Sequence, residues 1–141
     1  MENHTAAAEL GRLVLEFTEA FNRDDLDAVM SYFAEDAFYD EFHGARAHGK
    51  AAIRKVFEPQ FARAFGVIHF VAEDVFADEG TGQATVRWLC VIDKDDKRRA
   101  WRGLDVLRFR GGKLIEKETY AKAPVPGFHQ PEALSKESPA V

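Results

Sequence analysis

The sequence predicts an α+β domain in which the helices come first and an antiparallel sheet follows. Apolar residues recur at helical spacing up to about residue 65, and strand-like segments separated by short turns fill residues 67–122. Segregation of helices before strands is typical of α+β folds. The length of 141 residues fits one compact domain with its own core.

Two amphipathic helices are expected first. The earlier one covers residues 5–22, and its apolar stripe is Leu10, Leu13, Val14, Phe17 and Phe21. The second begins after a cap at Asp24 or Asp25, and its stripe is Leu26, Val29, Met30 and Phe33. Residues 37–44 then predict a short strand, because three aromatic residues within five positions favour a half-buried pleated surface.

A third helix is expected over residues 49–65. Its inward residues are Ile53, Val56, Phe57, Phe61 and Ala64. Pro59 lies inside this range and should kink the helix or split it. Gly66 is a plausible residue in the left-handed conformation after its end.

The second half of the chain predicts four strands, at 67–77, 83–93, 98–110 and 113–122, joined by the turns "DEGTG", "KDDK" and "GG". Short connections imply an antiparallel meander. We expect a strongly curved sheet wrapped around the helices, with one end of the core open as a pocket. Residues 1–122 would form this single domain, and the proline-rich residues 123–141 a C-terminal arm.

The composition limits the kinds of molecule that the protein is expected to bind and the compartment in which it is expected. A net charge of −5 argues against nucleic acid or an anionic membrane, since both need clustered positive charge. The single cysteine, Cys90, suits a reducing compartment. The chain has neither a secretory signal pattern nor an apolar run long enough to span a bilayer, so a cytoplasmic protein is expected.

One acid stands where a buried strand should be apolar. Alternation places Asp105 on the same face as Trp101, Gly103, Leu107 and Phe109, with the arginines on the other face. In an apolar pocket the protonated form of Asp105 would be favoured and could donate a hydrogen bond to an oxyanion. Alternatively, it pairs with a neighbour such as Arg87 or lies near the mouth of the pocket.

The segment "YDEFH" offers a second acid. Alternation groups Tyr39, Glu41 and His43 on one face, so Glu41 rather than Asp40 is favoured to point into the pocket. A slip of one residue would exchange the two acids. His43 could polarise a substrate, or it could be a loop residue bonded to water or backbone.

Other candidates are apolar. Trp88 and Trp101 fall on adjacent predicted strands and either line a pocket or fill the core. The same two alternatives hold for Phe17 and Phe21.

No metal site is expected, because the spacing of His43 and His48 is only weakly similar to that of metal ligands. The sequence has no phosphate loop, nucleotide fingerprint or nucleophile elbow, so no cofactor is expected.

Several segments resemble a known superfamily. They are "FTEAFNRDDLDAVMSYFAEDAFYDEF", "HGKAAIRKVF" and "GLDVLRFRGGKLIEKETY". Together they are similar to the nuclear-transport-factor-2-like (NTF2-like) superfamily, in the branch of ketosteroid isomerase and the SnoaL-like polyketide cyclases. The resemblance implies a cone-shaped pocket between helices and sheet and a homodimer that pairs sheet faces. It also puts Glu41 at the position of a catalytic base, Asp105 at that of a protonated acid, and Phe17 at that of a tyrosine.

These observations favour a cofactor-independent acid–base enzyme that enolises a small apolar substrate containing a ring. Glu41 would move the proton and Asp105 would steady the enolate oxygen, in a pocket lined by Phe17, Phe21, Tyr39, His43, Trp88, Trp101 and Gly103. Because Phe17 has no hydroxyl, a non-catalytic binding module for an apolar metabolite is the alternative. A dimerisation domain with a filled cavity is a third reading.

Overall fold

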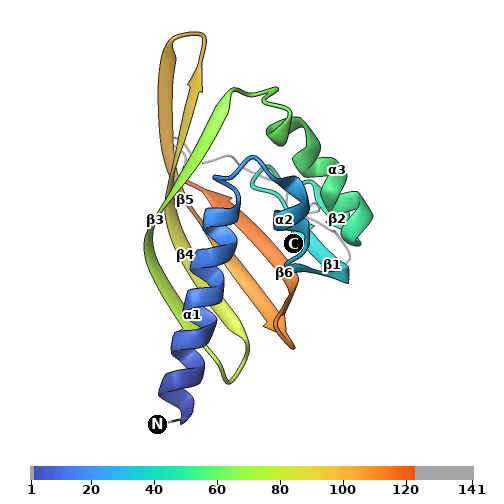
Figure 1. Cartoon of the computed structure of the whole chain (residues 1–141), viewed down its shortest axis with the longest axis vertical. Helices are drawn as coiled ribbons and strands as arrows, with labels where there is room; N and C mark the ends of the chain where they lie inside the picture. Colours follow the sequence, from blue (N-terminus) through green and yellow to red (C-terminus); the bar gives the residue numbers. More distant parts are fainter. Residues whose placement is uncertain (1, 123–141) are drawn as a thin grey trace, which may run out of the picture.

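The computed structural model describes residues 2–122, so the expected C-terminal arm, residues 123–141, lies outside the described residues. The elements follow in the order α1 (Glu2–Ala20), α2 (Leu26–Met30), β1 (Phe33–Asp40), β2 (Arg46–His48), α3 (Lys50–Phe61), β3 (Val67–Asp78), β4 (Gln83–Lys94), β5 (Lys97–Arg110) and β6 (Lys113–Ala121). Figure 1 shows their arrangement.

The strands form one six-stranded sheet in the order β2-β1-β6-β5-β4-β3. Strands β3 to β6 pair antiparallel in chain order, as the predicted meander requires. Strand β1 joins the other edge of β6 in parallel, and β2 pairs antiparallel with β1. The predicted α+β fold with a mainly antiparallel sheet is therefore confirmed.

The helices cover the inner face of the sheet, which is the face that carries Trp88 and Asp105. Helix α1 packs against β3 and β4, and α3 packs against β1 and β2. The sheet twists and curves between these two helices (Figure 1). Within residues 2–122, no helix combines the length and apolar character needed to cross a bilayer.

Helix α2 is shorter than its apolar stripe predicts. Asp25 caps it by accepting a hydrogen bond from the Ala28 N–H at 3.1 Å, but the helix ends at Met30. Phe33 opens β1 instead of closing the helix, and it is fully buried there. A single apolar residue fits both the helical period and the strand period, so the sequence pattern could not tell whether Phe33 belongs to the helix or to the strand. Strand β2, with three residues, is too short to give a pattern at all.

Helix α3 is a single helix with Pro59 in its last turn, where the missing N–H removes only one late hydrogen bond. It ends at Phe61, earlier than predicted, and Arg63 takes the left-handed conformation with φ 64°. Gly66 has a positive φ, 105°, as expected, but it lies beyond the end of α3 and has a different function. A Cβ at this position would lie 2.5 Å from the backbone oxygen of Asp93, so only glycine allows the chain to pass β4 so closely.

Candidate functional site

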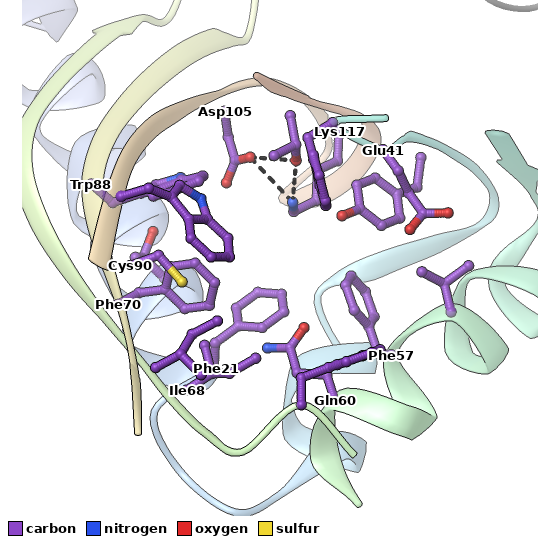
Figure 2. Close-up of a pocket in the computed structure, with 18 of the residues that line it drawn as sticks. Phe21, Glu41, Phe57, Gln60, Ile68, Phe70, Trp88, Cys90, Asp105 and Lys117 are labelled. Atoms are coloured by element: carbon purple, nitrogen blue, oxygen red, sulfur yellow. Dashed lines mark hydrogen bonds and ion pairs between the residues drawn. The ribbon is translucent and has the colours of Figure 1, made fainter. Parts of the chain in front are cut away.

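A cavity of about 580 Å³ opens between the inner face of the sheet and the helices. Its wall is largely aromatic, with rings from both helices and strands: Phe17, Phe21, Phe57, Phe70, Trp88 and Trp101. Several of these rings meet edge to face, for example Phe21 and Phe57 at 5.2 Å between centroids. Figure 2 shows this wall. Its size and aromatic character fit a small ring-containing molecule.

Three polar side chains of β5 and β6 meet at one end of the cavity: Asp105, Lys117 and Thr119, called here the inner cluster (Figure 2). Asp105 Oδ1 accepts hydrogen bonds from Thr119 Oγ1 at 2.6 Å and from Lys117 Nζ at 3.2 Å. Lys117 Nζ also donates to Thr119 Oγ1 at 2.7 Å. The side chains of Lys117 and Asp105 are 6% and 9% exposed, so bulk water hardly reaches the ion pair.

The register of β5 and β6 brings the inner cluster together. Asp105 lies directly opposite Thr119, and Lys117 lies two residues before Thr119 on β6, within diagonal reach of Asp105. A β-bulge precedes them, because Phe109 pairs with Leu114 while the next pair is Arg108 with Glu116. The extra residue between these pairs shifts the alternation by one, so Lys117 faces inward.

Sequence reasoning missed Lys117 and Thr119 for this reason. Regular alternation from buried Leu114 would turn Glu116 and Glu118 inward and Lys117 outward. The available signal was the adjacent apolar pair Leu114–Ile115, because two such neighbours in a strand mark a place where alternation can break.

The surroundings keep Lys117 positively charged. Burial alone lowers the pKa of Lys117, but the charge of Asp105 and the adjacent Tyr39 raise it by more, so the pKa lies above its ordinary value. Lys117 Nζ also lies 4.4 Å from the ring centroid of Tyr39, a cation–π contact. Burial raises the pKa of Tyr39 as well, so its hydroxyl remains neutral.

Asp105 acts as a hydrogen-bond acceptor in this arrangement. The resemblance assigned it the role of a protonated donor, yet an ammonium and a hydroxyl both donate to its Oδ1. Both contacts use this oxygen as an acceptor. Arg87, considered from the sequence as its partner, instead pairs with Asp74 at 2.7 Å. The group of the inner cluster that can donate into the cavity is therefore Lys117.

Glu41 and His43 form a second polar group on the cavity wall. His43 Nε2 lies 3.3 Å from Glu41 Oε1, and His43 Nδ1 accepts a backbone N–H two residues on. Glu41 is 17% exposed and His43 is 52% exposed, so the pair links the cavity to solvent. The other acid of this segment, Asp40, is not part of the wall and lies 3.7 Å from Arg46.

Of the apolar residues predicted to form the pocket, most line the cavity wall and one supports a wall residue from behind. Those on the wall are Phe17, Phe21, Tyr39, Trp88 and Trp101. Gly103, which we expected in the pocket, does not line the cavity. A Cβ on Gly103 would lie 2.4 Å from Cη2 of Trp88, so this glycine lets the indole rest directly on β5.

Two wall residues carry unusual polar groups. Trp88 is 4% exposed, and its Nε1–H has no hydrogen-bond partner within residues 2–122. A buried donor left unpaired costs about 1–3 kcal/mol. Cys90 lines the same wall, and burial raises the pKa of its thiol to about 11. The thiol is therefore protonated, and a weak nucleophile, at neutral pH.

A family model described as "SnoaL-like domain" matches residues 14–117, from the middle of α1 to the lysine of the inner cluster. The chain belongs to the SnoaL-like family. This confirms the NTF2-like resemblance drawn from the sequence motifs. No curated protein matches the sequence of this SnoaL-like protein.

Solved structures share the fold at low sequence identity. An NTF2-like protein of unknown function from Mesorhizobium loti is 21% identical, with a TM-score of 0.69, covering 83% of this chain and 93% of its own. A Xanthomonas campestris pv. campestris protein, provisionally described as a polyketide cyclase, gives the same four values. Bal32a, from a soil-derived mobile gene cassette, is 19% identical with a TM-score of 0.71, covering 82% of this chain and 91% of its own. At these identities the likeness establishes the fold alone.

Proposed function

We propose that this SnoaL-like protein is a cofactor-independent acid–base enzyme that enolises a small, apolar, ring-containing carbonyl compound. The observation that carries the proposal is the buried Lys117–Asp105 pair at one end of an otherwise apolar cavity. Enolisation removes a proton from the carbon next to a carbonyl, and isomerases, cyclases and dehydratases share this step. Such a step needs a base and a group that stabilises the enolate oxygen.

Lys117 would stabilise that oxygen. Its ammonium group gives hydrogen bonds to Asp105 and Thr119, and one of its three hydrogens remains for a ligand. The carbonyl oxygen gains negative charge as the enolate forms, so a fixed cation binds the transition state more strongly than the ketone. Asp105 and Thr119 would position the Lys117 nitrogen and balance its charge when the cavity is empty.

Glu41 would be the base. Tyr39 pairs with Lys117 across β1 and β6, and Glu41 lies two residues beyond Tyr39 on the same face. Two residues of extended chain span about 6–7 Å. A ketone whose oxygen contacts Lys117 would thus present its neighbouring carbon to the Glu41 carboxylate, and His43 would connect that carboxylate to solvent.

Hydrogen–deuterium exchange of 2-tetralone tests this proposal, because the ketone loses its C1 proton signals in D2O when it is enolised. We expect the protein to accelerate the exchange. Glu41→Gln and Lys117→Met should each lower the acceleration by about 10²-fold or more. Lys122→Met, which changes an exposed lysine just after β6, is the matched control and should keep the full rate. Equal rates in all four proteins would refute the catalytic proposal.

A binding module is the second candidate, and one observation favours it. Both acids on the wall already have partners, Asp105 with Lys117 and Glu41 with His43, so neither is a free base. In that case the cavity holds an apolar metabolite without changing it. Native mass spectrometry of the purified protein separates the two functions. A copurified compound recovered unchanged, together with no exchange of 2-tetralone, would identify the binding module.

We also propose that two copies pair through the outer face of the sheet, opposite the cavity. Strand β3 exposes Val67, Val71 and Phe76, and β6 exposes Tyr120. Large apolar side chains gathered on one face are characteristic of protein interfaces. A second copy would remove them from water while leaving the mouth of the cavity open.

A further inference from the structure

Two cations line the cavity where it opens to solvent. Lys94 and Arg99 belong to the cavity wall, and both residues are exposed, so they lie at its mouth. They come from the end of the β4–β5 hairpin, which extends beyond the helices (Figure 1). The exposed rings of Phe42 and Phe65 line the same mouth. The two cations therefore stand beside an apolar entrance.

The register of β4 and β5 places these cations on the cavity face of the sheet. Arg99 lies opposite Ile92, and Lys94 is two residues further along β4, so the cations are diagonal neighbours. Diagonal neighbours are about 7–8 Å apart, which lets two long side chains reach the same small group. Lys94 Nζ donates one hydrogen bond to the Ala64 carbonyl oxygen at 3.1 Å and keeps two hydrogens for a ligand.

No carboxylate among residues 2–122 forms an ion pair with either cation. The other charged side chains of the wall have partners, because Glu41 lies beside His43 and Asp105 beside Lys117. The acids of the turn between β4 and β5, residues 95 and 96, do not line the cavity. The mouth is therefore positively charged on the hairpin side, although the whole chain has a net charge of −5.

Arg99 differs in this respect from the other arginines of the strands. Its neighbour Arg98 turns to the outer face of the sheet and lies 2.7 Å from Asp93. The remaining strand arginines also pair with a carboxylate: Arg46, Arg87, Arg102, Arg108 and Arg110. Among the described strands, Arg99 is the arginine that faces the cavity and whose guanidinium is available to a ligand.

We infer that Lys94 and Arg99 bind a carboxylate group of the ligand at the mouth of the cavity. The planar guanidinium of arginine matches the two oxygens of a carboxylate, and the lysine ammonium adds a second charge-assisted hydrogen bond. A neutral polar group would gain less from either cation. The ligand would therefore be an organic acid whose apolar ring enters the cavity while its carboxylate stays at the mouth.

This inference rests on the proposed function, because it assumes that the cavity holds a ring-containing molecule. It adds an anchor that is separate from the inner cluster. Arg99 and Asp105 lie on the same strand and are separated by about 20 Å of extended chain. A carboxylate held at the mouth would thus leave Lys117 free and would orient the opposite end of the ligand toward it.

Binding of 2-naphthylacetate and 2-naphthylacetamide tests the subsite, because these probes have nearly the same shape and differ in charge. Isothermal titration calorimetry of the full chain at neutral pH measures both affinities. We expect the acid to bind about fivefold more tightly than the amide at low salt. The preference should shrink toward equal affinity in about 0.5 M salt, because exposed charges are screened. This comparison uses the unmodified protein and needs no variant.

Arg99→Gln removes the charge from the mouth and should lower the preference for the acid at least about threefold. Arg98→Gln is the matched control, because it removes an equal charge from the other face of the same hairpin, and it should keep the full preference. The amide should bind all three proteins equally, which verifies that the cavity is intact in the variants.

Equal affinity of the wild type for both probes, or a preference that survives Arg99→Gln, would overturn the carboxylate subsite and leave the small-molecule cavity intact. Failure of both probes to bind would overturn the cavity as a site for such molecules, and the subsite with it. Because 2-tetralone has no carboxylate, its hydrogen–deuterium exchange tests the proposed catalysis separately.

Discussion

Lys117 Nζ lies 3.2 Å from Asp105 Oδ1, and less than a tenth of either side chain is exposed. Each charge is stabilised in this apolar cavity by the other and by Thr119, which bonds to both. Removing one partner of a buried pair leaves an uncompensated charge, which costs far more than the pair contributes. The stability of the domain and the chemistry of its cavity therefore depend on the same two residues.

Asp105→Asn and Lys117→Met should each destabilise the fold by about 3–5 kcal/mol, because each leaves a buried charge unpaired. The double variant should lose clearly less than the sum of the two, with a coupling of at least about 1 kcal/mol. Urea unfolding measures all three. Arg102→Met, which breaks an exposed pair with Glu73, is the control and should cost less than about 1 kcal/mol. Additive losses at Asp105 and Lys117 would contradict a coupled pair.

Stability should also fall at high pH. Because the pKa of Lys117 is raised in the folded state, the folded protein keeps this proton longer than the unfolded chain. The contribution of the pair is therefore complete below the unfolded pKa of about 10.4 and is lost as the pH rises through the folded value. Urea midpoints should show no effect of the pair up to about pH 10, and between about pH 10 and pH 12 they should fall more steeply in the wild type than in Lys117→Met. Parallel pH curves for the wild type and Lys117→Met would contradict a raised pKa of Lys117 in the folded state.

Cys90 should resist thiol reagents. Burial raises the pKa of its thiol from 9.0 to about 11, so its thiolate fraction near pH 8 is about a hundredfold below that of a free thiol. The reaction with Ellman's reagent should be slower by at least this factor in the native protein than in urea. Cys90 is the single cysteine, so the colour reports on this residue alone. A native rate close to the unfolded rate would mean that the wall around Cys90 opens readily.

Two glycine substitutions should have opposite effects. Gly103→Ala would place its Cβ 2.4 Å from both the Trp88 ring and the Tyr120 backbone oxygen, so we expect a loss of about 1–3 kcal/mol and a displaced indole. A Cβ at Gly11 in α1 meets nothing within 4 Å, and alanine there should stabilise the helix by up to about 1 kcal/mol. Thermal unfolding and tryptophan fluorescence measure both effects. An unshifted emission spectrum in Gly103→Ala would argue against the contact.

The proposed dimer predicts that Val71→Glu and Phe76→Glu convert the protein to a monomer, because each places a charge within an apolar interface. Leu15→Glu, at an exposed leucine of α1, is the control and should not change the mass. Sedimentation velocity provides the measurement. A wild-type protein that sediments as a monomer at tens of micromolar would disprove pairing through this face.

Much of the fold followed from the sequence because its patterns are local. Alternation over β5 runs without interruption for most of its length, and it placed Trp101 and Asp105 on one face as the structure has them. The same rule put Glu41 rather than Asp40 on the cavity side. These positions need only the two-residue period of a strand.

Other features of the site could not be predicted from the sequence. They depend on breaks in the two-residue alternation of strands and on contacts between segments that are far apart in the chain. The bulge at Ile115 reverses the faces of β6, so Lys117 could not be assigned to the cavity by counting from Leu114. The partner of Asp105 was missed for the same reason. The sequence could not show either that the Trp88 N–H finds no acceptor among residues 2–122, because this depends on every neighbour in space.

The parallel pairing of β1 with β6 has a consequence for how the protein forms. Tyr39 and Lys117 are adjacent in the sheet, although most of the domain's sequence separates them. Contacts between such remote segments require closure of a long loop and tend to make folding slow. Lys117 and Glu41 would come together in the cavity only when β1 pairs with β6. A partly folded chain without this pairing should therefore bind no ligand. A ligand added during refolding should favour the folded state in which the two strands are paired.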